Sequence, residues 1–275
     1  MSDATSRTTA EMFSLDDFVH GRPERIIHAA KSPKILIVWH HGNEELGPRA
    51  ARHIFTQRPD LAPHVDYLCG DPQGAATQSP AAVLGYDVNR SYLPADGPAS
   101  YAQQRAQEIL AVIRAGNYDF VLDLHTAVGE QEQFFIVTQE LTPLIKKAVG
   151  ASPITKVVAM PDFVTRKTLI GYAPNAVAFE VNEKFSQTPQ AVQEVASIIE
   201  VLVGKAAPTP LSRDIFYVDT LVPKDQDPGE DAENFKLCRD GYYPIILGTG
   251  RHAYRNDPTK DYACFGAKRK ETLVL

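Results

Sequence analysis

The sequence is poor in cysteine. Its 275 residues include three cysteines, Cys69, Cys238 and Cys264, which lie far apart along the chain. An odd number of cysteines at these spacings provides neither a disulfide framework nor a C-x-x-C metal-binding motif. We therefore expect a protein of a reducing compartment, the cytoplasm, whose fold is stabilised by an apolar core and not by disulfide bonds.

Long apolar runs and an excess of basic residues are also absent. Residues 1–18 contain neither the basic nor the apolar segment of a secretion signal, and no uncharged apolar run approaches the roughly 20 residues that span a bilayer. The 28 lysines and arginines are outnumbered by 34 aspartates and glutamates, and the net charge of -6 disfavours binding to a phosphate backbone. We expect a soluble protein that binds neither a membrane nor nucleic acid.

What the sequence does contain is a regular alternation of strand-like and helix-like segments. Apolar, β-branched runs, typical of strands covered on both faces, lie at 34–39, 118–124, 133–137, 156–159 and 176–181. Segments with helical periodicity lie at 45–57, 101–115, 141–149 and 189–203. This alternation predicts an α/β fold with a mixed, mostly parallel twisted sheet and helices on both of its faces.

The chain divides into three parts by composition. Residues 1–33 are polar and weakly periodic, which predicts a loosely attached lead-in with one short helix near 14–20. Residues 34–205 hold the alternating strands and helices. After residue 206, prolines interrupt short β-type runs and helical periodicity is lost, so we predict a small β-rich C-terminal domain over 206–275.

Two histidines and a glutamate are candidate metal ligands. His41 and Glu44 are three residues apart, directly after a predicted strand, and the intervening glycine allows the tight turn that lets both side chains converge. His125 follows a second predicted strand, and the carboxyl ends of parallel strands meet at one edge of a sheet. Two histidines and one glutamate leave a position for water, as in catalytic zinc sites. Alternatively, these histidines are ordinary surface residues.

Three further polar residues are candidates for substrate chemistry. Asn89 and Arg90 supply an amide and a guanidinium group that suit a bidentate carboxylate. Glu180 stands within an apolar strand-like run, where burial would raise its pKa toward that of a general base. The alternative for Glu180 is a structural ion pair.

In this order along the chain, the motifs H-G-N-E, D-V-N-R, D-L-H-T and F-E-V resemble those of the aspartoacylase/succinylglutamate desuccinylase family, a branch of zinc-carboxypeptidase-like metalloenzymes. The resemblance extends from about residue 34 to residue 275. It implies one zinc ion per chain and a C-terminal domain that covers the active site. By resemblance, the zinc ligands are His41, Glu44 and His125, the carboxylate binders are Asn89 and Arg90, and the general base is Glu180.

The resemblance also implies two less well-matched substrate-binding residues and reveals one departure. Tyr254, with Tyr262 as the competing choice, is similar to a family tyrosine, and Arg166 is similar to a family arginine. Family members carry an oxyanion-binding arginine about eight residues ahead of the D-x-N-R motif, and this sequence has none there. Either zinc stabilises the charge alone, or the acyl specificity differs, or another cation enters the site, the candidates being Arg105, Arg166 and Lys184.

The function implied by the resemblance is that of a zinc-dependent amidohydrolase. Such an enzyme hydrolyses the amide bond of an N-acyl amino acid to a carboxylate and a free amino acid. A carboxypeptidase-type peptidase, an esterase and a non-catalytic metal- or effector-binding protein are alternatives that use the same residues. The expected partner is a small-molecule N-acyl amino acid, and a homo-oligomer is compatible with the sequence.

Overall fold

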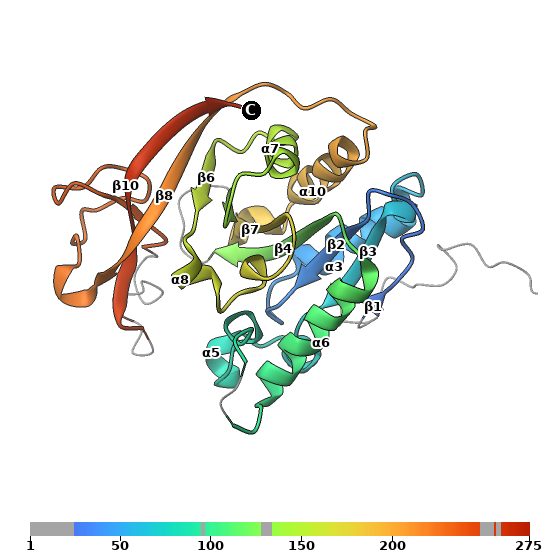
Figure 1. Ribbon diagram of the computed structural model, residues 1–275, viewed down its shortest axis with the longest axis horizontal. Helices are drawn as coiled ribbons and strands as arrows, with labels where there is room; N and C mark the ends of the chain where they lie inside the picture. The colour runs from blue at the N-terminus through green and yellow to red at the C-terminus, as the bar shows by residue number, and fades with distance from the viewer. Residues whose placement is uncertain (1–24, 95–96, 128–133, 248–255, 257–259) are drawn as a thin grey trace, which may run out of the picture.

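The structure is a computed structural model that describes residues 25–94, 97–127, 134–247, 256 and 260–275 (Figure 1). Ten strands of these residues form one sheet. They are β1 Arg25–Ile26, β2 Ile35–Trp39, β3 Val65–Cys69, β4 Phe120–Ala127, β5 Phe134–Thr138, β6 Lys156–Ala159, β7 Ala176–Asn182, β8 Ser212–Pro223, β9 Tyr243–Ile245 and β10 Tyr262–Val274. The strand order is β1-β3-β2-β4-β7-β5-β6-β8-β10-β9.

Most strand pairs at the centre of the sheet are parallel. Strands β3, β2, β4 and β7 run parallel, β5 is antiparallel to β7, and β6 is parallel to both β5 and β8. All five residues of β2 are buried, as expected of a strand covered on both faces. The predicted mixed, mostly parallel sheet is confirmed.

Helices cover both faces of the sheet. The longer helices are α3 Leu46–Gln57, α6 Tyr101–Gly116, α7 Pro143–Gly150 and α10 Pro189–Leu202, and the shorter ones are α4 Pro72–Thr77, α5 Ala81–Leu84, α8 Asp162–Thr165 and α9 Glu183–Ser186. Because successive side chains of a strand point to opposite faces, β2 contributes to two cores. Ile35, Ile37 and Trp39 pack with α3, α7 and α10, whereas Leu36 and Val38 pack with α6.

One sheet extends across residue 206. The long strand β8 pairs with β6 on one side and with β10 on the other, so the C-terminal strands continue the central sheet (Figure 1). The division of the chain into domains at residue 206 stays a prediction. The short helix expected near residues 14–20 lies outside the described residues. Among the described residues, no helix is long and apolar enough to cross a membrane.

The strand order places three candidate motifs side by side. Strand β4 lies between β2 and β7, and all three run in the same direction. His41 follows the carboxyl end of β2, while His125 on β4 is paired in register with Glu180 on β7. The sheet thereby brings residues about 140 positions apart in the sequence to one edge.

Candidate functional site

His41, Glu44 and His125 meet at the carboxyl ends of β2 and β4. Nδ1 of His41 lies 2.9 Å from Oε1 of Glu44, and Nδ1 of His125 lies 3.4 Å from Oε2 of the same carboxylate. One ligand atom from each of the three residues lies within 4.8 Å of the others. Gly42 is required in the turn, because a Cβ there would collide with the carbonyl oxygen of Gly74.

This group fits a divalent metal ion. Two imidazoles and a carboxylate are the donor set of many zinc sites, and they leave further coordination positions for water and substrate. Oε2 of Glu44 is buried, and apart from its ion-pair contact with Nδ1 of His125 it has no hydrogen-bond donor among the described residues. The His41 side chain retains 19% exposure, which leaves the group accessible from outside.

The charges around this group favour a cation. Burial lowers the pKa of His41, but the carboxylates of Glu44 and Asp87 outweigh burial and raise that pKa to about 10. Burial raises the pKa of Glu44, but His41 and His125 outweigh it and lower that pKa to about 2. The cluster therefore needs positive charge between its members, which either protons or a metal ion can supply.

A second layer of carboxylates holds the two imidazoles. Asp87 lies 3.3 Å from Nε2 of His41, and Asp123 lies 2.9 Å from Nε2 of His125. Metal-binding histidines commonly direct their other ring nitrogen to such a carboxylate, which orients the ring. Asn89 also contacts His125, with its Nδ2 3.0 Å from Nε2, while its own Oδ1 accepts a hydrogen bond from the backbone of Leu169.

Behind His125 lies a buried chain of polar residues that the sequence analysis did not identify. The hydroxyl of Tyr92 lies 2.7 Å from Nε2 of His40, and Nδ1 of His40 lies 2.8 Å from Oδ1 of Asp123. Burial raises the pKa of Asp123, but His125 and His40 outweigh it and hold the pKa below its usual range. A carboxylate inside an apolar strand is the signal that pointed to Glu180, and it applies equally to Asp123.

A second group of possible ligands shares a residue with the first. His40, Asp123 and His125 also offer ligand atoms within 4.8 Å of one another. All three residues are buried, and Asp123 already lies between the two imidazoles as their ion-pair partner. Both groups contain His125, so the described residues offer two alternative sets of metal ligands.

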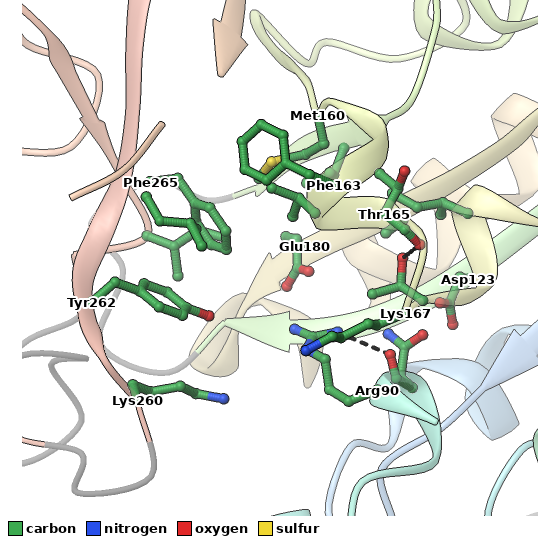
Figure 2. Close-up of a pocket in the computed structure, with 18 of the residues that line it drawn as sticks. Arg90, Asp123, Met160, Phe163, Thr165, Lys167, Glu180, Lys260, Tyr262 and Phe265 are labelled. Atoms are coloured by element: carbon green, nitrogen blue, oxygen red, sulfur yellow. Dashed lines mark hydrogen bonds between the residues drawn. The ribbon is translucent and has the colours of Figure 1, made fainter. Parts of the chain in front are cut away.

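A cavity of about 360 Å³ lies beside these clusters (Figure 2). Glu180, Asn89, Arg90 and Asp123 are among its lining residues. His41 and Glu44 are not among them, and the cavity reaches the cluster through Asn89 and Asp123, which contact His125. Burial raises the pKa of Glu180, although the positive charge of His125 opposes this rise.

The remaining predicted residues have different positions. Arg166 is exposed and does not line the cavity, whereas its neighbour Lys167 does. Tyr254 lies outside the described residues. Tyr262, the competing tyrosine, lines the cavity and directs its hydroxyl toward it from β10 (Figure 2). Lys260 lines the same side and was also missed by the sequence analysis.

Two of the cations considered as replacements for the family arginine lie elsewhere. Arg105 is buried on α6 and donates hydrogen bonds to the carbonyl oxygens of Gly70 and Cys69 at the end of β3. Lys184 is exposed on α9 and is not among the residues that line the cavity. The described cations in the lining are Arg90, Lys167 and Lys260.

Fold and site together define an α/β protein with a mixed, mostly parallel sheet and a His-Glu-His cluster at the carboxyl edge of that sheet. Solved structures share this fold. Murine aminoacylase 3 matches with a TM-score of 0.63 and 17% identity, over 90% of this chain and 98% of that chain. Succinylglutamate desuccinylase from Chromobacterium violaceum matches with a TM-score of 0.68 and 14% identity, over 91% of this chain and 88% of that chain.

A third match is succinylglutamate desuccinylase from Vibrio parahaemolyticus, with a TM-score of 0.61 and 14% identity, over 91% of this chain and 88% of that chain. No family model and no curated protein matches the sequence. The similarity predicted from the four motifs is therefore confirmed for the fold, which this chain shares with proteins of the aspartoacylase/succinylglutamate desuccinylase family.

Proposed function

We propose that this protein is a zinc-dependent amidohydrolase that cleaves the amide bond of an N-acyl amino acid. The observation that carries the proposal is the convergence of His41, Glu44 and His125 beside a cavity lined by Glu180 and Arg90. The names of the structural neighbours, an aminoacylase and desuccinylases, support a deacylase. The cluster supplies a metal site, and the cavity supplies the carboxylate of Glu180 and the guanidinium group of Arg90; together these groups suffice for the reaction.

His41, Glu44 and His125 would hold one zinc ion per chain. We favour this group over His40, Asp123 and His125 because His41 is partly exposed, so that water and substrate can reach an ion held there. In the other group every residue is buried, and Asp123 already pairs with both imidazoles. When bound, the metal ion lowers the pKa of a water molecule and polarises the scissile carbonyl group.

Glu180 acts as the general base. Its carboxylate lines the cavity, and burial raises its pKa toward the range suited to a general base. Hydrolysis adds one water across the amide: the water oxygen bonds to the acyl carbon, the carbon–nitrogen bond breaks, and the nitrogen takes up a proton. Glu180 accepts the proton from the attacking water and returns it to the leaving nitrogen, so it is regenerated in each turnover.

Metal content and activity together test the proposal. The purified protein should contain about one zinc ion per chain. It should release amino acid from at least one member of a panel of N-acetyl, N-succinyl and longer N-acyl amino acids, and lose this activity on chelation. Preferential cleavage of peptides or of esters would support the peptidase or esterase alternative. Zinc binding with no hydrolysis of any compound would support a non-catalytic metal-binding protein.

Arg90 is expected to bind the carboxylate of the substrate. Replacing Arg90 by lysine keeps the positive charge but removes the planar guanidinium group that can bind both oxygens of a carboxylate. We therefore expect kcat/KM to fall by the equivalent of about 1–3 kcal/mol, while the zinc content stays unchanged. The measurement compares a substrate that has a free α-carboxylate with its amide. The wild type should prefer the free acid, and Arg90→Ala should lose that preference.

A matched control and a contrary outcome define the role of Arg90. Arg114 is exposed on α6, so Arg114→Ala should retain the preference for the free acid. An equal loss of activity toward acid and amide in Arg90→Ala would instead assign Arg90 to the oxyanion or to the fold.

Tyr92 is expected to tune zinc affinity through His40 and Asp123. Tyr92→Phe keeps the ring but removes the hydroxyl that contacts His40, so the orientation of His125 should loosen and zinc affinity should fall about tenfold. Competition with a chromophoric chelator measures this affinity. Tyr172→Phe is the control, because Tyr172 stacks on Tyr92 but is exposed. Identical zinc affinities in Tyr92→Phe and wild type would show that the contacts from Tyr92 through His40 to Asp123 do not support the metal site.

A further inference from the structure

The cavity beside Glu180 has two chemically different sides. In Figure 2, Met160, Phe163 and Phe265 gather on one side of Glu180, whereas Arg90 and Lys167 lie on the other. Tyr262, whose ring contacts that of Phe265, and Lys260 stand at the end of the cavity below Phe265. Met160, Phe163 and Phe265 come from separate parts of the chain: the end of β6, helix α8 and strand β10. Strands on both sides of β8 therefore contribute to one apolar wall.

The apolar wall has no buried cation among the described residues. Met160 and Phe265 are 3% and 5% exposed, and Val137 beside them is 5% exposed. The lysines and the arginine of the lining are exposed or half-buried. A carboxylate placed against this wall would lose its hydration without gaining an ion pair there, whereas an alkyl or aryl group would gain free energy from burial.

The position of the wall identifies which part of the substrate it contacts. In an N-acyl amino acid, the carboxylate and the acyl group lie on opposite sides of the scissile amide. With the carboxylate at Arg90 and the amide beside Glu180, the acyl group extends toward Met160, Phe163 and Phe265 (Figure 2). The cavity of about 360 Å³ lies within the size range of small-molecule sites and has room for more than an acetyl group.

We propose that the preferred substrate carries an uncharged, apolar acyl group larger than acetyl, and not a second carboxylate as in a succinyl group. This inference rests on the proposed amidohydrolase function and concerns the acyl specificity of the same site. A wall without a buried cation suits an uncharged acyl group.

The test compares three acyl groups on the same amino acid: acetyl, butanoyl and succinyl. Butanoyl and succinyl have the same four-carbon chain and differ by a methyl group against a carboxylate. For the wild-type enzyme with its bound metal, kcat/KM for butanoyl should exceed that for acetyl by about fivefold or more, and that for succinyl by about tenfold or more. Calorimetric binding of the same compounds to the Glu180→Gln variant should give the same order of affinity.

The variant Phe163→Arg places a cation on the apolar wall. Phe163 is 42% exposed, so the fold should tolerate the change. The ratio of butanoyl to succinyl activity should fall about tenfold relative to wild type. Leu237→Arg is the control, because Leu237 is 61% exposed and is not part of the lining, and its ratio should equal that of the wild type.

The possible failures are distinguishable. Succinyl activity equal to or above butanoyl activity in the wild type would overturn the acyl inference and leave the amidohydrolase function standing. An unchanged ratio in Phe163→Arg would overturn the assignment of the wall to the acyl group. Absence of hydrolysis for every N-acyl amino acid, with zinc bound, would overturn the proposed function itself and the acyl inference with it.

Discussion

Replacing His125 by alanine is expected to abolish metal binding, lowering the zinc content from about one ion per chain to less than about 0.1, and to abolish hydrolysis. His125 is the member common to both possible ligand groups, so its removal leaves only two ligands in either of them. Two ligands on one turn, such as His41 and Glu44, hold zinc far more weakly than three converging ones. Elemental analysis after dialysis measures the content, and circular dichroism checks that the variant folds.

Single replacements of the neighbouring histidines identify which group holds the metal. His41 belongs only to the group with Glu44, and His40 belongs only to the group with Asp123. We expect His41→Ala to lose zinc and His40→Ala to retain it with reduced affinity. The opposite result would show that the buried group of His40, Asp123 and His125 holds the metal. His53→Ala is the control, since His53 on α3 contacts Gln57 and lies in neither group.

The elements that follow simple periodicity were predictable from the sequence. The predicted strand at 156–159 corresponds to β6. The predicted helix at 189–203 corresponds to α10, which ends one residue earlier, at Leu202. Strand β3 was missed because Asp66 interrupts its apolar pattern. In the structure Asp66 is buried and accepts hydrogen bonds from the backbone of His28 and Ala29 and from the hydroxyl of Tyr118. Burial of that carboxylate depends on distant partners that no local pattern reveals.

Strand β10 was missed for a different reason. Its second half carries the charged run 268–271 and is largely exposed, so it lacks the apolar character of the central strands. It is held instead by pairing along most of its length with β8. Gly266 allows this pairing, because a Cβ at that position would crowd the side chains of Thr220 and Val222.

The candidate site shows the same division between local and distant information. The spacing of His41 and Glu44 is a local signal, and the order of parallel strands brings His125 to them. The contact between His40 and Tyr92 joins residues 52 positions apart, and no periodicity predicts it. Lys167 and not Arg166 lines the cavity because the short helix α8 and the turn after it set which side chain faces inward.

Replacing Glu180 by glutamine is expected to lower turnover by about 100-fold or more while zinc content stays unchanged. Glutamine preserves the volume and the hydrogen-bonding capacity of the side chain, but it cannot accept a proton from the attacking water. Because burial raises the pKa of Glu180, wild-type activity should fall as the pH drops through that raised pKa and the carboxylate becomes protonated. The weak residual activity of Glu180→Gln should not show this fall in activity at low pH, which we call the acidic limb of the pH profile.

Glu194 provides a matched control for this prediction. It is also a largely buried glutamate whose pKa is raised by burial, but it lies on α10, where Gln190 donates a hydrogen bond to it. Glu194→Gln therefore makes the same chemical change in a similar environment, away from the cavity. This variant should keep the wild-type turnover and the acidic limb of the wild-type pH profile. Full activity in Glu180→Gln would exclude a proton-accepting role for Glu180. A loss of zinc together with turnover would instead show that the carboxylate supports the metal cluster, since Glu180 is paired in register with His125.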